Sequence, residues 1–436
     1  MSESDNSNPA FAAGQIDRYQ KENEGNTLIV TGRKKTILLT SLFTNFFVLL
    51  GLYCGVISVL LPNHVAQIDP ANKANNLAIV MTSALLFTIF AQPIAGALSD
   101  RCRSGWGRRS PWIVGGALIG GLAIFGISMM TTIAGIAVFW LMAAVSLNCM
   151  NGPLATVVAD RFRPENRGVA SGFVGAGSTA GGTVGIILAG YLAWNLQLGY
   201  LVFGLAIAAC CIAFVLINRE PSTRTLAVEP FHWGTFFKSF WVSPRQYPDF
   251  GWAFFGRFAM FLGYQGVVTY QLYILQDYVG LSVQQSNYAI GTISVITLAT
   301  LLFSGLVSGW LSDKLKRRKI FVFASSVLMA IGLAVPLVMP TLNGMYIYAA
   351  ILGLGYGAYT SIDMALMTEV LPAGGQQAGK DMGILTIATV LPQSFSPILS
   401  AWLLATFNND YSYLFIAAMI AVFASSFFVL PIKSVK

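Results

Sequence analysis

Long apolar runs alternate along this chain with short polar segments. A helix needs about 20 mostly apolar residues to cross the hydrocarbon core of a bilayer, and most of these runs reach that length. The pattern therefore predicts an all-α integral membrane protein with twelve transmembrane helices. We expect the helices over 36–61, 76–99, 111–131, 134–159, 167–194, 198–218, 248–275, 285–312, 319–339, 343–370, 380–406 and 411–431.

The polar segment between the second and third runs recurs in the second half of the chain. It begins at Gly96 and reads GALSDRCRSGWGRR. Five of its positions reappear later, because Gly96, Leu98, Ser99, Asp100 and Arg101 match Gly309, Leu311, Ser312, Asp313 and Lys314. The first and seventh runs also correspond, as FTNFFVLLG from Phe43 and FGRFAMFLG from Phe255. These echoes predict two pseudo-symmetric six-helix bundles.

The repeat and the polar segments together suggest how the chain is divided. The boundaries follow the long polar stretch at the start and the one long loop in the middle. We expect an N-terminal tail over 1–35, a first bundle over 36–218, a central loop over 219–247, a second bundle over 248–431 and a short tail over 432–436.

Composition and charge place the chain in a membrane. Hydrophobic residues make up 55% and charged residues 10% of the 436 positions, an apolar surplus that no soluble surface could cover. The net charge of +8 does not indicate nucleic acid binding, because the cations are confined to one side. Of 26 Lys and Arg, only Lys73 falls in a loop on the other face and only Arg257 lies deep within a predicted span. Cationic loops stay in the cytoplasm, so we expect a multi-pass protein of the cell (inner) membrane with both termini cytoplasmic.

The first polar hairpin carries a recognisable motif. Gly-x-x-x-Asp-Arg followed by Gly-Arg-Arg, at Gly96, Asp100, Arg101, Arg108 and Arg109, resembles the signature of the major facilitator superfamily of secondary transporters. The resemblance implies two bundles that rock about a central site. The longer spacing, with Ser99, Ser104, Gly107 and Pro111, is most similar to the sucrose transporters and the glycoside, pentoside and hexuronide cation symporters. Sucrose transporters carry an Arg shortly after the Gly-Pro of helix four, whereas Leu154 and Ala155 follow Pro153 here.

Charged residues at the cytoplasmic helix ends are interpreted as a gate. A small residue, an acid and a basic cluster allow close helix approach and place a carboxylate near a helix N-terminus. Ion pairs and helix caps account for such charges better than direct substrate contact does, because they lie at headgroup depth. The expected gating residues are Gly96, Asp100, Arg101, Arg108, Arg109, Asp160, Arg167, Asp313, Lys314, Arg317 and Glu369.

Two charged residues lie well inside predicted spans, Arg257 in helix seven and Asp363 in helix ten. Intramembrane charges are costly and mark functional sites by default. The family resemblance places helices one, four, seven and ten around the cavity, so we expect Arg257 and Asp363 to pair there and to couple transport or confer substrate polarity. A permanent structural ion pair is the alternative.

A sugar site needs hydrogen-bonding side chains beside flat apolar surfaces. The residues of these types on the four helices that the resemblance places at the cavity are Asn45, Tyr53, Asn148, Asn151, Tyr264, Gln265, Tyr270, Gln271, Tyr356 and Tyr359. Packing or interfacial anchoring is the alternative for the tyrosines. Asn148 and Gln265 are the strongest candidates, because they are amides near mid-span without an obvious partner.

These observations predict a secondary active transporter that works by alternating access. We expect uptake of a sugar or glycoside with a cation, a proton being favoured, by a monomer in the lipid bilayer. Export of a small metabolite or drug is the first alternative; a transporter-like solute sensor or a membrane enzyme is the second. The sequence shows no paired nucleophile and base, phosphate loop or metal-ligand spacing, so we expect no catalytic residues, metal or cofactor.

Overall fold

The computed structural model describes residues 29–224, 248–315, 317–369 and 378–432, and helices dominate all four stretches. The elements of the first half are α2 (Gly32–Gly55), η1 (Val56–Leu60), α3 (Leu61–Ile68), α4 (Lys73–Ser83), α5 (Leu85–Ser99), α6 (Ser110–Ile127), α7 (Ile133–Arg161), α8 (Pro164–Leu192) and α9 (Leu196–Ile217). Those of the second half are α11 (Pro248–Thr269), α12 (Gln271–Tyr273), η2 (Ile274–Tyr278), α13 (Val283–Leu315), α14 (Arg318–Val338), α15 (Leu342–Glu369), α16 (Ala378–Thr406) and α17 (Tyr411–Phe428).

These elements form twelve helical rods in the described part of the chain, since some of them run on into one another. The first rod is α2, η1 and α3, the second is α4 and α5, and the seventh is α11, α12 and η2. Each predicted span overlaps one rod. By length and composition alone, eight helices or joined helices of the described residues could cross a membrane.

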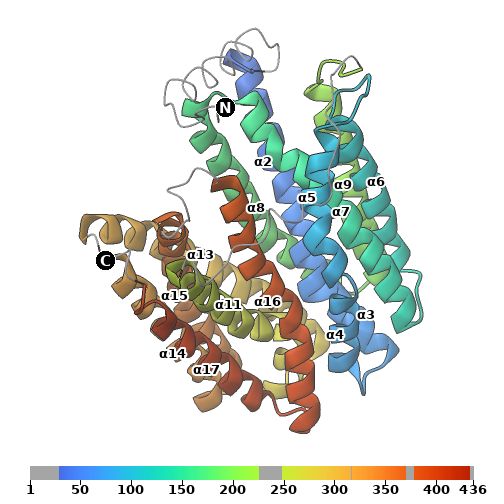
Figure 1. Ribbon diagram of the computed structural model, residues 1–436. Coiled ribbons are helices and arrows are strands. Elements are labelled where there is room, and N and C mark those ends of the chain that lie inside the picture. The colour runs from blue at the N-terminus through green and yellow to red at the C-terminus, as the bar shows by residue number, and fades with distance from the viewer. Residues whose placement is uncertain (1–28, 225–247, 316, 370–377, 433–436) are drawn as a thin grey trace, which may run out of the picture.

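The rods pack as two halves. Within the first half, α2 lies against α8 and α6 lies against α7 and α9; within the second, α15 packs on α13 and α14, and α11 on α16 and α17. The halves meet along α8 with α13 and along α4 and α5 with α16. In Figure 1 the two halves lie close together near α3 and α4 and diverge toward the other end.

A short π-helical segment near the end of the first rod of each half repeats the sequence symmetry. It is η1 in the first half and η2 in the second. Such wide turns inside helices are uncommon, so their appearance in corresponding rods supports a common origin of the two bundles.

Glycines allow α2 and α8 to cross at backbone contact. A side chain at Gly177, Gly181 or Gly185 would collide with the backbone of α2 at Phe43, Phe47 or Gly51, whereas Gly172 and Gly175 face open space. The colliding glycines recur every four residues, which places them on one helix face. The α2–α8 crossing is therefore built without intervening side chains.

The end at which the halves meet is called the closed end below. There the Asn63 amide donates to Asn287 Oδ1 at 2.8 Å, and the Tyr273 hydroxyl donates to the Pro62 carbonyl at 2.9 Å. The Tyr270 hydroxyl donates to the Ala74 carbonyl at 2.9 Å. All three contacts join the first half to the second. The opposite end, with the α5–α6 and α13–α14 connections, is called the open end.

Candidate functional site

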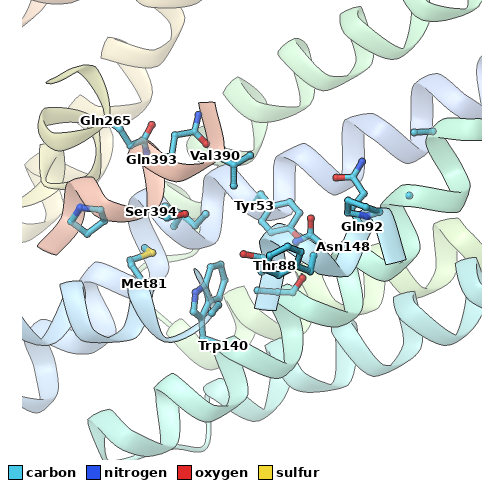
Figure 2. Close-up of a pocket in the computed structure, with 18 of the residues that line it drawn as sticks. Tyr53, Met81, Thr88, Gln92, Trp140, Asn148, Gln265, Val390, Gln393 and Ser394 are labelled. Carbon is cyan, nitrogen blue, oxygen red and sulfur yellow. The ribbon is translucent and has the colours of Figure 1, made fainter. Parts of the chain in front are cut away.

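A cavity of about 600 Å³ lies between the two halves. The first half contributes Tyr53, Ile57, Met81, Ala84, Thr88, Phe90, Gln92, Pro93, Gly96, Trp140, Ala144, Asn148, Gly152, Ala155 and Thr156. The second half contributes Gln265, Thr269, Val390, Gln393, Ser394 and Pro397. Figure 2 shows labelled side chains from both halves around the same space. The described residues of this lining include amides, hydroxyls and aromatic rings and no charged side chain.

Three of the expected substrate-contact residues line this cavity. Asn148 on α7 donates to the Tyr53 hydroxyl at 3.2 Å and to the Ala144 carbonyl at 2.8 Å. Gln265 on α11 donates to Thr269 Oγ1 at 3.4 Å, a long bond that leaves its carbonyl oxygen with acceptor capacity. Tyr53, Asn148 and Gln265 therefore bring polar side chains to the cavity from both halves.

Several other polar and aromatic residues of the lining were not predicted from the sequence. Trp140 is 4% exposed on α7, Thr88 and Gln92 come from α5, and Gln393 and Ser394 come from α16. The candidates expected from the sequence lie on helices one, four, seven and ten, whereas α5 and α16, the second and eleventh rods, also face the cavity. The sequence feature that could have identified these two helices is a proline inside each of them. Both prolines, Pro93 and Pro397, also line the cavity.

The remaining candidates for substrate contact lie away from the lining. Asn45 is 2% exposed; its amide donates to the Ser41 carbonyl, and its Oδ1 accepts from Cys211 Sγ at 3.3 Å, so it lies inside the first bundle. Asn151, on the same helix as Asn148, has a buried Oδ1 without a hydrogen-bond partner. Gln271 and Tyr270 lie at the closed end, where Tyr270 hydrogen-bonds to Ala74 and to Pro397.

Arg257 on α11 and Asp363 on α15 lie together, with Nε 3.5 Å from Oδ2. Their side chains are 13% and 5% exposed, and neither belongs to the cavity lining. The Tyr359 hydroxyl hydrogen-bonds to the Asp363 carboxylate, and Tyr356 stacks on Tyr264 between the same two helices. The structure thus brings together the two intramembrane charges but places them beside the cavity.

An ionic cluster occupies the open end of the first half. Arg109 is 3% exposed; its Nε lies 2.5 Å from Asp160 Oδ2 and its Nη2 lies 2.9 Å from Asp100 Oδ1. Arg108 reaches the same Asp160 oxygen at 2.9 Å, and Glu220 accepts from the Arg109 backbone N–H at 3.1 Å. These contacts tie α5, α6, α7 and the start of the central loop to one another, all on one half.

Two other expected gating residues of this half donate hydrogen bonds to backbone carbonyls near helix ends. Arg101 donates to the Ala97 carbonyl at 3.1 Å, and Arg167 donates to the Ala159 carbonyl at 2.8 Å. Gly96 does not make the close helix approach expected of it, because a side chain there would meet nothing within 4 Å. The reason is that Gly96 faces the cavity between the diverging halves.

In the second copy of the motif, fewer side chains belong to the described part of the structure. Lys314 lies over the Trp310 ring, with Nζ 5.0 Å from the centroid, and Arg317 precedes α14. Asp313 and Glu369 belong to α13 and α15, but their side chains lie outside the described part of the structure. Gly309 does approach a neighbour, since a side chain there would meet Ser361 Oγ at 2.8 Å.

At the closed end, Asp69 lies in the α3–α4 connection and Asp277 lies in η2. The pKa of Asp69 is held below its ordinary value, first by the side-chain hydrogen bond from Asn72 and then by bonds from the Asn72 backbone and the Asn76 side chain. Asp277 of the second half pairs with Lys73 of the first, with Oδ1 2.7 Å from Nζ. This end therefore combines hydrogen bonds and an ion pair across the two halves.

Solved structures share the fold. A D-xylose-proton symporter superposes with a TM-score of 0.66 at 18% identity, over 92% of this chain and 98% of that chain. A nucleoside transporter superposes with a TM-score of 0.72 at 13% identity, over 91% of this chain and 99% of that chain. At such identities the likeness establishes the architecture.

Characterised sequences are related more closely. A fujikurins efflux protein of Gibberella fujikuroi is 26% identical over 372 residues, which span 81% of this chain and 73% of that protein. A sucrose transport protein of Arabidopsis thaliana is 26% identical over 376 residues, which span 70% of this chain and 72% of that protein.

A sequence model of a protein family identifies the family of this chain. The model of the Major Facilitator Superfamily matches residues 41–374 and 272–435, which together cover most of both bundles. The predicted two-bundle, all-helical architecture is confirmed by this match and by the superpositions. The chain belongs to the Major Facilitator Superfamily and is a multi-pass membrane transporter for small molecules.

Proposed function

We propose that this transporter takes up a neutral sugar or glycoside together with a proton. The observation that carries the proposal is the cavity lining, in which the described residues supply amides, hydroxyls and the Trp140 ring but no charge. Hydroxyl-rich neutral solutes need such donors and acceptors beside a flat apolar surface. A volume of about 600 Å³ lies within the usual range for small-ligand sites.

The coupling site in this proposal is Asp363. Its side chain is 5% exposed and lies between Arg257 and the Tyr359 hydroxyl. If a proton neutralised Asp363, the attraction to Arg257 would be lost, and the two side chains could separate. A single buried carboxylate with a separable partner is therefore suited to load and release one proton in each cycle.

The orientation follows from charge. The open end carries the Arg-rich hairpins that are retained in the cytoplasm, so we infer that this conformation is open to the cytoplasm and sealed on the outside. Both chain termini then lie in the cytoplasm of a cell with the transporter in its inner membrane. One chain contains both bundles and the cavity between them, and a monomer is sufficient for transport.

Two relatives favour this substrate class, because one is a sucrose transport protein and one solved structure is a D-xylose-proton symporter. The fujikurins efflux protein supports the second candidate, export of a small metabolite. The charge-free described lining agrees with either solute. The direction of coupled flux separates the two candidates.

The test uses the purified protein in liposomes with radiolabelled sucrose, D-xylose and methyl-β-glucoside. We expect an inward pH gradient to drive accumulation of at least one sugar, and a sodium gradient to have no effect. Asp363→Asn should abolish accumulation and retain equilibrium exchange, while Glu165→Gln, an exposed carboxylate at the start of α8, serves as the matched control. No accumulation of any sugar under either gradient would favour export instead.

A further inference from the structure

Two rows of side chains face each other across α11 and α15. The α11 row has spacing i, i+4, i+7 and the α15 row has spacing i, i+3, i+7, which keeps each row on one helix face. The rows are Arg257, Phe261 and Tyr264 on α11, and Tyr356, Tyr359 and Asp363 on α15.

The rows touch at both ends. Arg257 meets Asp363 at one end, with Nε 3.5 Å from Oδ2. At the other end the Tyr264 and Tyr356 rings stack, with centroids 4.4 Å apart and an interplanar angle of 5°. Seven residues separate the two contacts on each helix, a rise of about 10 Å, so the antiparallel helices are in register over this distance.

Phe261 connects the two contacts. Its ring meets Tyr356 edge-on, with centroids 6.3 Å apart and an interplanar angle of 88°, and the Arg257 guanidinium carbon lies 5.8 Å from its centroid. The backbones of α11 and α15 pack on other helices of the bundle, so the contact between them is made by these long side chains. A shift of one row is therefore transmitted to the other through the rings.

Along α11, the stack is one residue away from the cavity lining. Gln265 follows Tyr264 directly on α11 and lines the cavity. Any displacement of α11 by a solute at Gln265 also displaces the Tyr264 ring, because both belong to one helical turn. The distance along the helix from Gln265 to Arg257 is about 12 Å.

The ion pair itself is loosely made. The Arg257 Nε–H has no hydrogen-bond partner although Asp363 Oδ2 is 3.5 Å away. Arg109, by contrast, binds Asp160 at 2.5 Å and Asp100 at 2.9 Å. An ion pair without an aligned hydrogen bond is less stable than a bidentate pair and therefore separates more easily.

We propose that Tyr264 and Tyr356 are positioning residues for ion coupling. Their stack sets the register of α11 against α15, so that solute contact at Gln265 determines whether Arg257 and Asp363 remain paired. The inference rests on the proposed sugar and proton symport and names the residues that connect its two sites. A stack that serves packing alone would affect stability without separating accumulation from exchange.

The experiment compares Tyr356→Leu and Tyr264→Leu with the wild type in liposomes, using whichever of labelled sucrose, D-xylose or methyl-β-glucoside the wild type accumulates. We expect the accumulation ratio under a pH gradient to fall about tenfold, the usual size of a lost coupling, while equilibrium exchange stays within about twofold. Tyr356→Phe keeps the ring and should behave as the wild type.

Tyr346→Leu, on α15 but outside the row, is the matched control and should leave the accumulation ratio unchanged. Unchanged accumulation in both stack variants would overturn the inference while leaving the proposed function intact. Equal loss of exchange and accumulation would also overturn it, because the stack would then serve folding or solute binding. A wild type that accumulates none of the three sugars would overturn the proposed function and the inference with it.

Discussion

Lys73 and Asp277 lie on opposite halves of the transporter and form an ion pair, with Nζ 2.7 Å from Oδ1. The Tyr411 hydroxyl donates to the second Asp277 oxygen at 2.9 Å, and the Lys73 ammonium lies 4.8 Å from the Tyr273 ring centroid. The two Lys73 contacts join the halves at the closed end, whereas the Tyr411 bond lies within the second half. The Lys73 contacts must separate if the transporter opens on this side.

We predict that Asp277→Asn shifts the protein toward the state opened at this end. A partly exposed ion pair contributes about 1 kcal/mol at most, so the shift should be about fivefold. Nitroxides attached to Gln67→Cys and Ser282→Cys report the separation by double electron–electron resonance, and the longer distance should gain population.

Asp410→Asn, an exposed helix cap on the same face, is the control and should leave the distance distribution unchanged. The exchange of charges in Lys73→Asp with Asp277→Lys should restore the closed population. Identical distributions for Asp277→Asn and the wild type would show that the hydrogen bonds of Tyr270 and Tyr273 close this end without the ion pair.

Arg109→Gln should lower the stability of the first half. The change removes the buried cation that joins Asp100 to Asp160, but Arg108 still binds Asp160 and Asp100 is half exposed, so the expected cost is about 2 kcal/mol. Thermal unfolding in detergent is the measurement. Arg103→Gln, exposed on the same connection, should leave the midpoint unchanged, and equal midpoints for both variants would contradict a structural role of the cluster.

Trp140→Ala should weaken solute binding. The ring is 4% exposed and lines the cavity, so its removal takes away a flat apolar surface and leaves the polar atoms in place. We expect KM to rise about tenfold, which corresponds to about 1.4 kcal/mol, and Trp140→Phe to lie between the two. Trp194→Ala, 77% exposed at the end of α8, is the control. An unchanged KM in Trp140→Ala would exclude the ring from the binding site.

Gly185→Ala and Gly175→Ala should have effects of opposite sign although both lie on α8. A methyl group at Gly185 would collide with the Gly51 backbone, and such overpacking costs about 1–3 kcal/mol. At Gly175 a methyl group meets nothing within 4 Å, so alanine should raise helix stability by up to about 1 kcal/mol. Thermal midpoints in detergent measure both effects, and a neutral Gly185→Ala would show that α2 can move aside.

The sequence alone was sufficient for the architecture. Apolar length determines where a helix can span a bilayer, and this requirement is local, so the predicted spans coincide with the observed rods. The hairpin at Asp100 is repeated at Asp313. This repeat indicated two bundles, because a repeated motif folds in the same way twice. The motif of this hairpin also led to the family.

The content of the cavity was decided by tertiary structure. Arg257 and Asp363 were predicted to pair because the family resemblance places their two helices at the cavity, and they do lie together. Their place beside the cavity, and the contribution of Gln92 and Gln393 to its lining, depend on how each rod is rotated and tilted against its neighbours. A helix that is apolar on nearly all sides carries little information about that rotation, because lipid and protein interior favour the same side chains.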